Sequence, residues 1–239
     1  FMTASNLLNI LRQTAMISVA AIGMTFAITA GQIDLSTGGV TATSSLLTAL
    51  MLQRAPMIVA VLVGLGVGIV FGAVNGIILT KCRIPAFIVT LGTSSVYTGI
   101  ARAMTNLEAV SVTNNTFTHY FGSGNIGFIP TLFLWTIILT LIGQYVYKKT
   151  SFGRAVLAVG GNESSARYSG INTDRVKFWS MVICGAAAAC AGILYAGRMH
   201  GARYTYGEND SMNIIAAVVI GGTSFSGGKG TVFGTLLGS

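Results

Sequence analysis

The residues that most suggest chemistry form a glycine-rich stretch, GGTSFSGGKGT, at residues 221–231. Glycines beside a lysine and hydroxyl side chains are typical of loops that bind the phosphates of a nucleotide. That motif needs a glycine five positions before its Gly-Lys pair and a hydroxyl directly after the lysine. Gly228 and Lys229 fit, but Thr223 occupies the first position and Gly230 the last. We therefore predict a break in a membrane segment here and no nucleotide site.

Other residue types used in catalysis are scattered along the chain. His119 and His200 lie in polar segments, and neither has a serine or cysteine partner at a convincing spacing. Cys184 and Cys190 lie six positions apart, which places them about 120° apart around a helix, and Cys82 is distant from both. Neither an HExxH nor a GxSxG motif occurs. We expect no catalytic residue, no metal site and no cofactor.

Asp34 is the only acidic residue inside an apolar segment. An ionisable residue within a membrane segment is a functional candidate, and Asp is also a favoured residue at the start of a helix. We expect a structural role in capping the following helix, with a direct substrate contact as the alternative. The candidate translocation-path residues are Asp34, Ser36, Thr37, Thr93, Ser94 and Asn213, with Thr90 beside them.

The composition is that of a polytopic membrane protein. Of the 239 residues 52% are hydrophobic and only 8% are charged, which is too few charges for a soluble surface. The 31 glycines agree with close packing of membrane helices. The net charge of +8 is explained by basic residues kept on the cytoplasmic side, so we expect no nucleic-acid partner.

Apolar segments and basic loops predict the topology. The expected spans are 15–30, 56–80, 86–104, 131–147 and 178–197. Residues 148–177 are the most charged stretch and carry mostly basic residues, which places them in the cytoplasm. Residues 105–130 contain no lysine or arginine and form the expected outer loop. We expect one all-α, multi-pass transmembrane domain over residues 1–239.

Two apolar segments are interrupted in the same way. GQIDLSTGG, residues 31–39, and GGTSFSGGKG, residues 221–230, each separate two apolar runs. Irregular backbone at membrane depth is tolerated only inside protein or against a water-filled cavity, and transporters often carry such pairs near the substrate path. Small residues also recur every fourth position, which predicts close helix packing at Gly64, Gly68, Gly72, Gly230 and Gly234.

The stretch GGNESSARYSGIN, residues 160–172, predicts a turn at its two glycines followed by one short helix on the cytoplasmic side. Asn162 is expected at the N-cap, Glu163 in the first turn with Arg167 one turn later, and Gly170 at the end. A solvated connector is the simpler interpretation, and a docking helix for a cytoplasmic partner is the functional one. The docking candidates are Asn162, Glu163, Ser164, Ala166, Arg167 and Gly170.

Four motifs, taken in order, resemble the permease subunits of bacterial sugar ABC importers. They are GQIDLS, PAFIVTLGT, FGRAVLAVGGNESSARYSGIN and IAAVVIGGTSFSGGKGTVFGTLLG. The likeness is greatest to the ribose-type permease, with galactoside, xylose, galactofuranose and autoinducer-2 permeases as relatives. Ser211, Met212, Asn213 and Ile214 replace the family's usual Glu-Leu-Asp-Ala. Compared with that family the first and last spans are missing, so we expect the sequence to be part of a longer chain.

The resemblance implies a subunit of the bacterial inner membrane that forms the path for a monosaccharide such as ribose and is not itself an enzyme. It implies a separate cytoplasmic ATP-binding subunit docked on residues 160–172, and a periplasmic or lipid-anchored sugar-binding protein. A second permease subunit, identical or different, would complete the path among membrane lipids. The alternatives are a related permease for branched-chain amino acids, nucleosides or an autoinducer, and a proton-coupled carrier that uses Asp34.

Overall fold

The computed structural model describes residues 3–127 and 129–239 and is almost entirely helical, as predicted. Phe1 and residue 128, the latter in the expected outer loop, lie outside the described residues. The helical elements are α1 (Ala4–Thr29), α2 (Thr37–Leu52), α3 (Met57–Cys82), α4 (Ala86–Thr105), α5 (Asn115–Thr118), the π-helical turn η1 (His119–Ser123), α6 (Thr131–Lys149), α7 (Ser151–Gly161), α8 (Glu163–Tyr168), α9 (Thr173–Arg198), α10 (Asp210–Ile220) and α11 (Val232–Gly238). Two antiparallel ribbons pair β1 (Val110–Ser111) with β4 (Gly201–Ala202) and β2 (Asn125–Ile126) with β3 (Ile129–Pro130).

The prolines explain where three of the helices begin. Pro56, Pro85 and Pro130, the only prolines of the chain, stand directly before α3, α4 and α6. Proline has no backbone N–H and a fixed φ, so it suits the start of a helix and disfavours continuing one across it. These helices therefore start within one residue of the expected spans.

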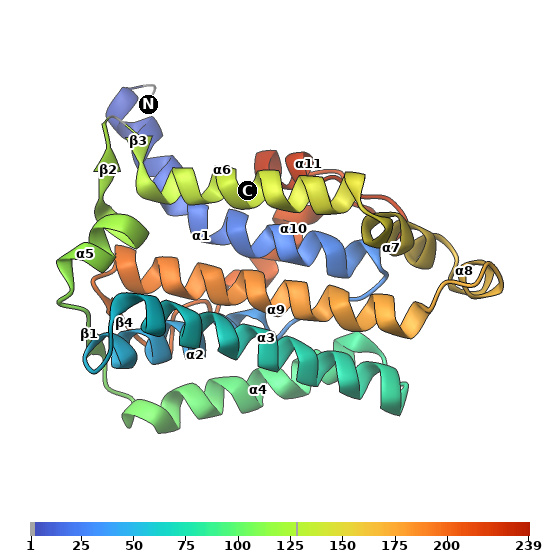
Figure 1. The fold of residues 1–239 in the computed structure, drawn as a ribbon, viewed down its shortest axis with the longest axis horizontal. Coiled ribbons are helices and arrows are strands. Elements are labelled where there is room, and N and C mark those ends of the chain that lie inside the picture. The colour runs from blue at the N-terminus through green and yellow to red at the C-terminus, as the bar shows by residue number, and fades with distance from the viewer. Residues whose placement is uncertain (1–2, 128) are drawn as a thin grey trace.

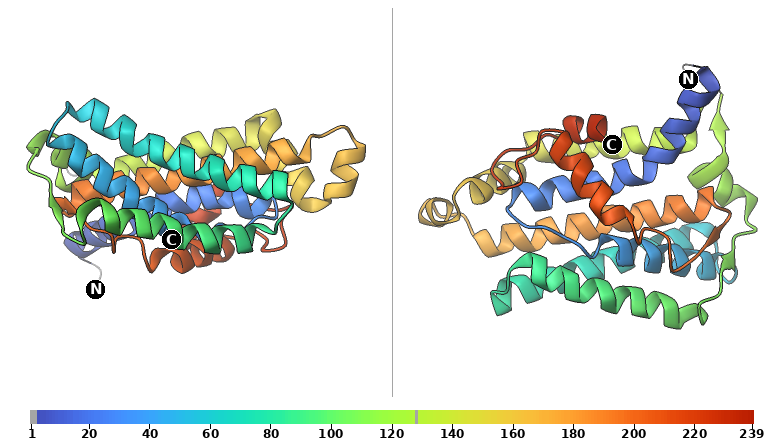
Figure 2. Two further views of the ribbon diagram at one scale, coloured as in Figure 1. Left: turned by 90° about the horizontal axis from the view of Figure 1, so that it is seen from below. Right: turned by 180° about the vertical axis from the view of Figure 1, so that it is seen from behind.

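The long helices lie side by side along the longest axis of the molecule (Figures 1 and 2). Those long and apolar enough to cross a membrane, within the described residues, are Leu8–Thr29, Met57–Cys82, Thr131–Lys149 and Thr173–Arg198. The span expected at 86–104 does form a helix, α4, but it does not belong to this apolar group. Its serines, threonines and Arg102 lower its hydropathy, and four of these residues, Ser94, Ser95, Thr98 and Arg102, line one cavity.

Helix α9 is the centre of the bundle, with α1, α2 and α3 packed against it. The predicted glycines of α3 lie in these contacts. A Cβ added to Gly72 would lie 2.5 Å from the Met181 carbonyl oxygen and 2.9 Å from the Val182 Cα. Gly68 lies against Gly185 of α9, so here too the helix backbones approach each other directly. Only glycine permits this approach, which is the packing typical of membrane helices.

Hydroxyl groups join the same helices in the interior. Ser44 of α2 donates to the Gly64 carbonyl at 2.9 Å and lies 3.1 Å from the Ala189 carbonyl. Thr41 donates to the Ala188 carbonyl at 3.1 Å. Bonds of this kind stabilise helix contacts in an apolar environment, where an unpaired hydroxyl is costly. Helix α2 is therefore held to both α3 and α9.

Both predicted breaks are places where the chain turns back on itself (Figures 1 and 2). Residues 30–36 join α1 to α2, and residues 221–231 join α10 to α11, each without regular structure over most of its length. Helix α11 returns along α10, with Gly234 against Gly221 and Gly238 against Ala217. The second break is thus the tip of a helical hairpin, whereas the first leads from α1 to a helix that packs on α3, α4 and α9.

The second break packs against the end of α1 and the start of the first break. The Gly228 N–H donates to the Thr29 carbonyl oxygen at 2.9 Å. A Cβ added to Gly227 would lie 2.9 Å from the Gly160 carbonyl oxygen and 3.1 Å from the Gly31 nitrogen. The loop that carries Gly228 follows a helix, α10, and packs on the backbone of other segments. It is a junction between elements, and it interrupts the apolar segment where the sequence predicts a break.

The turn expected at Gly160 and Gly161 is wrong, because both residues belong to the last turn of α7. Helix α7 itself was not foreseen; it begins after Thr150, whose hydroxyl accepts from the Gly153 N–H at 3.2 Å. A Cβ on Gly160 would collide with the Thr29 carbonyl. Glycine is therefore needed at position 160 because α7 approaches the end of α1 closely, and not because the chain bends there.

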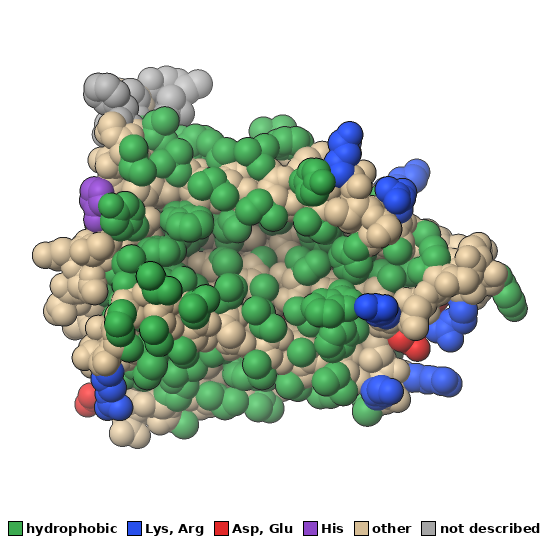
Figure 3. Space-filling view, in the orientation of Figure 1, with side chains coloured by type: hydrophobic (Ala, Val, Ile, Leu, Met, Phe, Trp, Pro, Cys, Tyr) green, Lys and Arg blue, Asp and Glu red, His purple; other side chains and the backbone are tan. Residues whose placement is uncertain are grey.

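The surface has the polarity of a membrane protein (Figure 3). Hydrophobic side chains cover the middle of the visible face, and lysines and arginines gather at the end that carries α7 and α8. Exposed apolar residues line the outer sides of the long helices, among them Leu62, Val70, Ile88, Val96, Leu141 and Tyr145. The basic end is the one that the loop charges predict to be cytoplasmic.

Candidate functional site

The first break is held by a chain of buried hydrogen bonds. Asp34 accepts from the Ser36 N–H at 2.8 Å and from the Ser36 hydroxyl at 2.6 Å. The Ser36 oxygen accepts from the Asn75 side-chain amide at 2.8 Å, and Asn75 accepts from the Tyr97 hydroxyl at 3.0 Å. Asp34 is only 1% exposed, and one of its carboxylate oxygens has no partner among the described residues. The chain of bonds ties the break to α3 and α4.

Asp34 stabilises the N-cap residue of α2, but it is not itself that cap. The N-cap residue is Ser36, whose side chain makes no capping bond to the helix. Asp34 instead fixes Ser36 through its backbone and its hydroxyl. The capping role expected for Asp34 is therefore wrong, because the N-cap is Ser36. Asp34 instead shapes the break two residues before that cap.

Thr90 of α4 pins the middle of the same break. Its hydroxyl accepts from the Leu35 N–H at 3.0 Å and lies 3.2 Å from the Ile33 carbonyl oxygen. It is also 2.9 Å from the Ala86 carbonyl, one turn back on its own helix. Thr90 is completely buried, so these backbone groups have no access to water as a substitute partner.

One cavity lies beyond the break on the side away from α8. Its volume is about 670 Å³. It is lined by Leu35, Gly38, Gly39, Leu91, Ser94, Ser95, Thr98, Gly99, Arg102, Glu208, Asn209, Ser211 and Met212. The polar groups are mainly hydroxyls and an amide, and the two charged side chains lie 3.6 Å apart as an ion pair. We call this space the outer cavity.

Ser211 places α10 against the start of α2 within the outer cavity. Its hydroxyl accepts from the Gly38 N–H at 3.2 Å and lies 3.1 Å from the Thr37 hydroxyl. The first N–H groups of a helix have no partner in their own helix, so this contact satisfies one of them. Ser211 is itself uncharged, so it adds no charge to the cavity wall at this point.

A second cavity, of about 530 Å³, lies on the α8 side of the break. It is lined by Gly31, Gln32, Leu79, Thr80, Arg83, Ile84, Pro85, Ala86, Glu163, Arg167, Asp174 and Lys177. Charged side chains surround it, in contrast to the outer cavity. We call it the inner cavity. Leu35 lines the outer cavity and Gly31 and Gln32 line the inner one, so the break separates the two.

Helix α8 forms as the sequence predicts. The Asn162 side chain accepts from the Ser165 N–H at 2.8 Å, and Gly170 ends the segment with a φ of +84°. Ala166 is buried, with 4% of its surface exposed, while Tyr168 is 94% exposed. The helix therefore has one anchored face and one free face at the end of the molecule (Figure 1).

The charged residues of α8 are bound to α9. Lys177 donates to Glu163 at 2.7 Å, and this hydrogen bond lowers the pKa of Glu163 below its ordinary value. Arg167 donates to the Thr173 hydroxyl at 2.7 Å and to Asp174 at 3.3 Å, in addition to its 3.5 Å contact with Glu163. The predicted docking residues Glu163 and Arg167 thus face the start of α9. Ser164 and Tyr168 remain on the exposed side.

The structure brings only part of the predicted path together. Of the candidates, Ser94 lines the outer cavity. Three others are buried near the break without lining a cavity: Asp34, Ser36 and Thr37. The Thr93 hydroxyl bonds within its own helix, to the Thr90 carbonyl at 3.4 Å, and Asn213 is exposed on α10. Gly234 packs against Gly221 as predicted, but the helix packing expected at Gly230 is wrong, because Gly230 lies in the loop before α11, against Thr29 and Tyr147.

Ser95, Thr98, Asn209 and Ser211 line the outer cavity and were not singled out from the sequence. A signal for the first two exists: polar residues of α4 recur at helical spacing, which indicates one polar face on an otherwise apolar helix. Asn209 is the N-cap of α10 and Ser211 lies in its first turn, and no local pattern marks them as cavity residues.

Comparisons with known proteins agree with this architecture. Residues 6–239 match the family model described as branched-chain amino acid transport system / permease component. Over its full length the chain is similar to the ribose import permease protein RbsC of Bacillus subtilis strain 168, at 39% identity and covering 74% of that protein. It is 38% identical to the protein of the same name in Escherichia coli K12, covering 76% of it.

The D-allose transport system permease protein AlsC of Escherichia coli K12 is 35% identical over the whole chain, which covers 73% of that relative. No solved structure was found to match. The family match covers nearly every residue, and the apolar helices agree with a multi-pass membrane protein. The chain therefore belongs to the family of ABC-transporter permease components that this model describes.

Proposed function

We propose that this chain forms the translocation path of an ATP-driven importer for a monosaccharide such as ribose, in the bacterial inner membrane. Several relatives are named as ribose or allose permeases, which supports a sugar as the substrate. The observation that carries the proposal is the position of the first break. It forms a thin partition, built of backbone and buried hydrogen bonds, between an outer and an inner cavity.

A partition of this kind suits alternating access. The break is held by a few specific bonds, chiefly those from Thr90 and those between Asp34 and Ser36. Transport requires an element with two arrangements that ligands bias, and irregular backbone between packed helices is a natural place for it. When the bonds to α4 open, the two cavities would join and the substrate would pass.

The chemistry of the outer cavity favours a polyhydroxyl substrate. Ser94, Ser95, Thr98 and Asn209 offer both donors and acceptors, as sugar hydroxyls require. Its charged lining residues, Arg102 and Glu208, are paired with each other. No unpaired charge among the described lining residues is available for the amino and carboxyl groups of an amino acid. This argues against the amino-acid alternative.

A proton-coupled carrier is also disfavoured. A relay needs a carboxylate that reaches the path, and Asp34 is buried and lines neither cavity. Its hydrogen bonds go to the neighbouring residue Ser36. Asp34 has the position of a structural support for the break.

For energy coupling, we propose that a cytoplasmic ATP-binding subunit docks on α8. The exposed side of α8, with Tyr168 at its end, would contact that subunit. The other side is joined to α9 through Glu163 and Arg167, which also line the inner cavity together with Gln32 of the break. A movement of α8 would therefore be transmitted directly to α9 and, across the inner cavity, to the break.

The remaining partners follow from the two ends of the molecule. A sugar-binding protein would deliver substrate at the end opposite α8, where the β1–β4 ribbon and the loop before α10 lie (Figure 1). A second permease subunit, identical or different, would complete the path. Membrane lipid would cover the exposed apolar faces of the long helices.

The test uses the complete permease purified with its ATP-binding subunit and reconstituted in proteoliposomes. Tyr168→Ala should lose the ATP-binding subunit in a pull-down, and Arg167→Glu should separate ATP hydrolysis from uptake while the permease stays folded. Tyr145→Ala is the matched control, because Tyr145 is 66% exposed on α6, away from α8. Normal sugar uptake by both α8 variants would defeat the docking role. Uptake that follows the proton gradient and needs no ATP would defeat the importer.

A further inference from the structure

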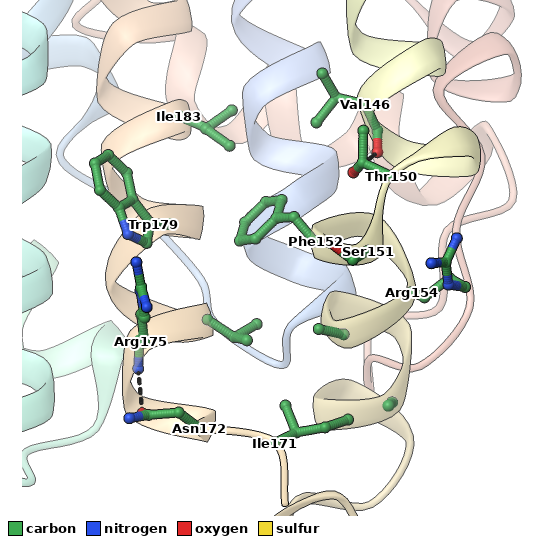
Figure 4. Close-up of a pocket in the computed structure, with 13 residues that line it drawn as sticks. Val146, Thr150, Ser151, Phe152, Arg154, Ile171, Asn172, Arg175, Trp179 and Ile183 are labelled. Carbon is green, nitrogen blue, oxygen red and sulfur yellow. Dashed lines mark hydrogen bonds between the residues drawn. The ribbon is translucent and has the colours of Figure 1, made fainter.

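A third cavity, separate from the path, opens between α7 and α9. Its volume is about 980 Å³. It is lined by Val146, Thr150, Ser151, Phe152, Arg154, Ala155, Ala158, Ile171, Asn172, Arg175, Val176, Trp179 and Ile183. The end of α6 forms one wall and α7 faces α9 across the opening (Figure 4). We call this space the lateral groove.

The floor of the lateral groove is apolar and suits hydrocarbon. Ile183 of α9 and Phe152 of α7 point toward one another, with Val146 at the end nearer the centre of α6 (Figure 4). The opening lies on the flank of the bundle, outside the inner and outer cavities. A flexible acyl chain could lie along such a floor with favourable burial of its methylene groups.

The rim of the groove is positively charged. Arg175 lies beside Trp179 along α9, next to the opening, whereas Arg154 lies on the outer flank of α7 and points away from the opening (Figure 4). Both arginines are exposed, and neither forms an ion pair with a described acidic side chain, unlike Arg167 and Lys177 nearby. None of the residues that line the groove is acidic. The groove thus offers positive charge without an internal counter-ion.

Trp179 indicates where the lateral groove lies relative to the membrane surface. Its side chain is exposed on the α9 surface, one turn from Arg175 and one turn before Ile183. Tryptophan is enriched where the hydrocarbon meets the head groups, because its ring is apolar and its N–H can bond to polar groups. The lateral groove therefore crosses that boundary, with charge on one side and an apolar floor on the other.

We propose that the lateral groove binds one anionic phospholipid, with its phosphate at Arg175 and an acyl chain along Phe152 and Ile183. Basic pockets between membrane helices on the cytoplasmic side are suited to anionic head groups. A zwitterionic lipid would gain the same apolar contact but would lack the net charge. This assignment rests on the proposed orientation, with α7 and α8 in the cytoplasm.

A bound lipid would bridge α7 and α9. These helices also carry the contacts that connect α8 to the rest of the molecule, through Gly160 at the tip of α1 and through Lys177 and Asp174. The lipid would hold α7 at a fixed distance from α9 beside the docking helix. It is thus placed to support the position of α8.

The experiment measures lipid selectivity at Trp179 directly. The complete permease is prepared with Trp179 as its sole tryptophan, with Trp135→Phe included, and is reconstituted with brominated phosphatidylglycerol or brominated phosphatidylcholine. Bromine quenches tryptophan fluorescence on contact. We expect phosphatidylglycerol to bind next to Trp179 about fivefold more strongly than phosphatidylcholine, from the attraction of one basic residue to an anionic lipid.

Arg175→Gln should bring this preference close to unity. The matched control is Lys81→Gln, which removes the same charge outside the groove lining and should keep the preference. If the arginine variant does not fold, the unaltered side chains are tested by raising the salt concentration, which should reduce the preference.

Equal quenching by the two lipids in the unaltered side-chain background would overturn the proposal. Absence of quenching by both would also overturn it, because the groove would then be filled by protein. The readout involves neither ATP nor sugar. Failure of the lipid site therefore leaves the importer proposal standing, and failure of the importer assays leaves the lipid result intact.

Discussion

Replacing Gly72 by alanine should destabilise the bundle at its centre. The added Cβ would lie 2.5 Å from the Met181 carbonyl oxygen and 2.9 Å from the Val182 Cα, where ordinary contacts are 3.4–4 Å. Both neighbours are backbone atoms of α9, which cannot rotate away as a side chain could. Helices α3 and α9 must therefore separate by about 1 Å at this point, and the surrounding atom pairs lose about a quarter to a half of their van der Waals attraction.

We expect a cost of about 2–3 kcal/mol, in the range of overpacked cores. For a protein of this size that corresponds to a melting temperature lower by about 4–12 °C. Gly66→Ala is the matched control, since it lies on the same helix and its added Cβ would meet nothing within 4 Å. Melting curves of the complete permease in mild detergent, followed by size-exclusion chromatography, measure the difference. Identical melting of the two variants would show that α3 and α9 are not packed through backbone contact.

Three further predictions concern the break, the outer cavity and α8. Thr90→Val removes the acceptor of the buried Leu35 N–H, which should lower the free energy of unfolding by about 1–3 kcal/mol in a melting experiment. Thr93→Val should cost less, because the Thr93 hydroxyl bonds only within α4. The reverse order of the two costs would contradict the role of Thr90 in holding the break. Thr98→Ala should raise the KM for sugar uptake about threefold to tenfold, the loss of one hydrogen bond, and an unchanged KM would remove Thr98 from the path. The bond from Lys177 lowers the pKa of Glu163, so its stabilisation of α8 is present above the ordinary value of 4.5 and is lost as the pH falls through the lowered value. Hydrogen exchange of α8, corrected for intrinsic rates, should rise at that acid pH in the native protein, while Glu163→Gln should show no such step.

Local signals in the sequence predicted much of the fold. The three prolines before α3, α4 and α6 act within their own helices, and Asn162 caps α8 through a bond to a residue three positions away. Such features depend on neighbours in the chain, so a sequence pattern contains them. Helix α7 was missed because its paired glycines resemble a turn, and their use against Thr29 becomes visible only in three dimensions.

The site was less predictable for the same reason. The sequence marks Asp34 as a candidate, but its surroundings depend on Asn75 and Tyr97, which reach it through Ser36 from distant parts of the chain. Likewise the outer cavity joins α4 to the loop before α10. No spacing rule connects residues across such separations, and only the packed helices decide which hydroxyls face a cavity.

The contact between the end of α1 and the second break has a consequence for biosynthesis. Gly228 is made about 200 residues after Thr29. At about 5–20 residues per second, the tip of α1 waits roughly 10–40 s for the N–H that completes it. During that interval the polar break must stay in the translocon or under other helices, because lipid offers it no partner. Ribosome pausing between α9 and α10 would lengthen this exposed period, so quality control of the nascent chain should act most strongly there.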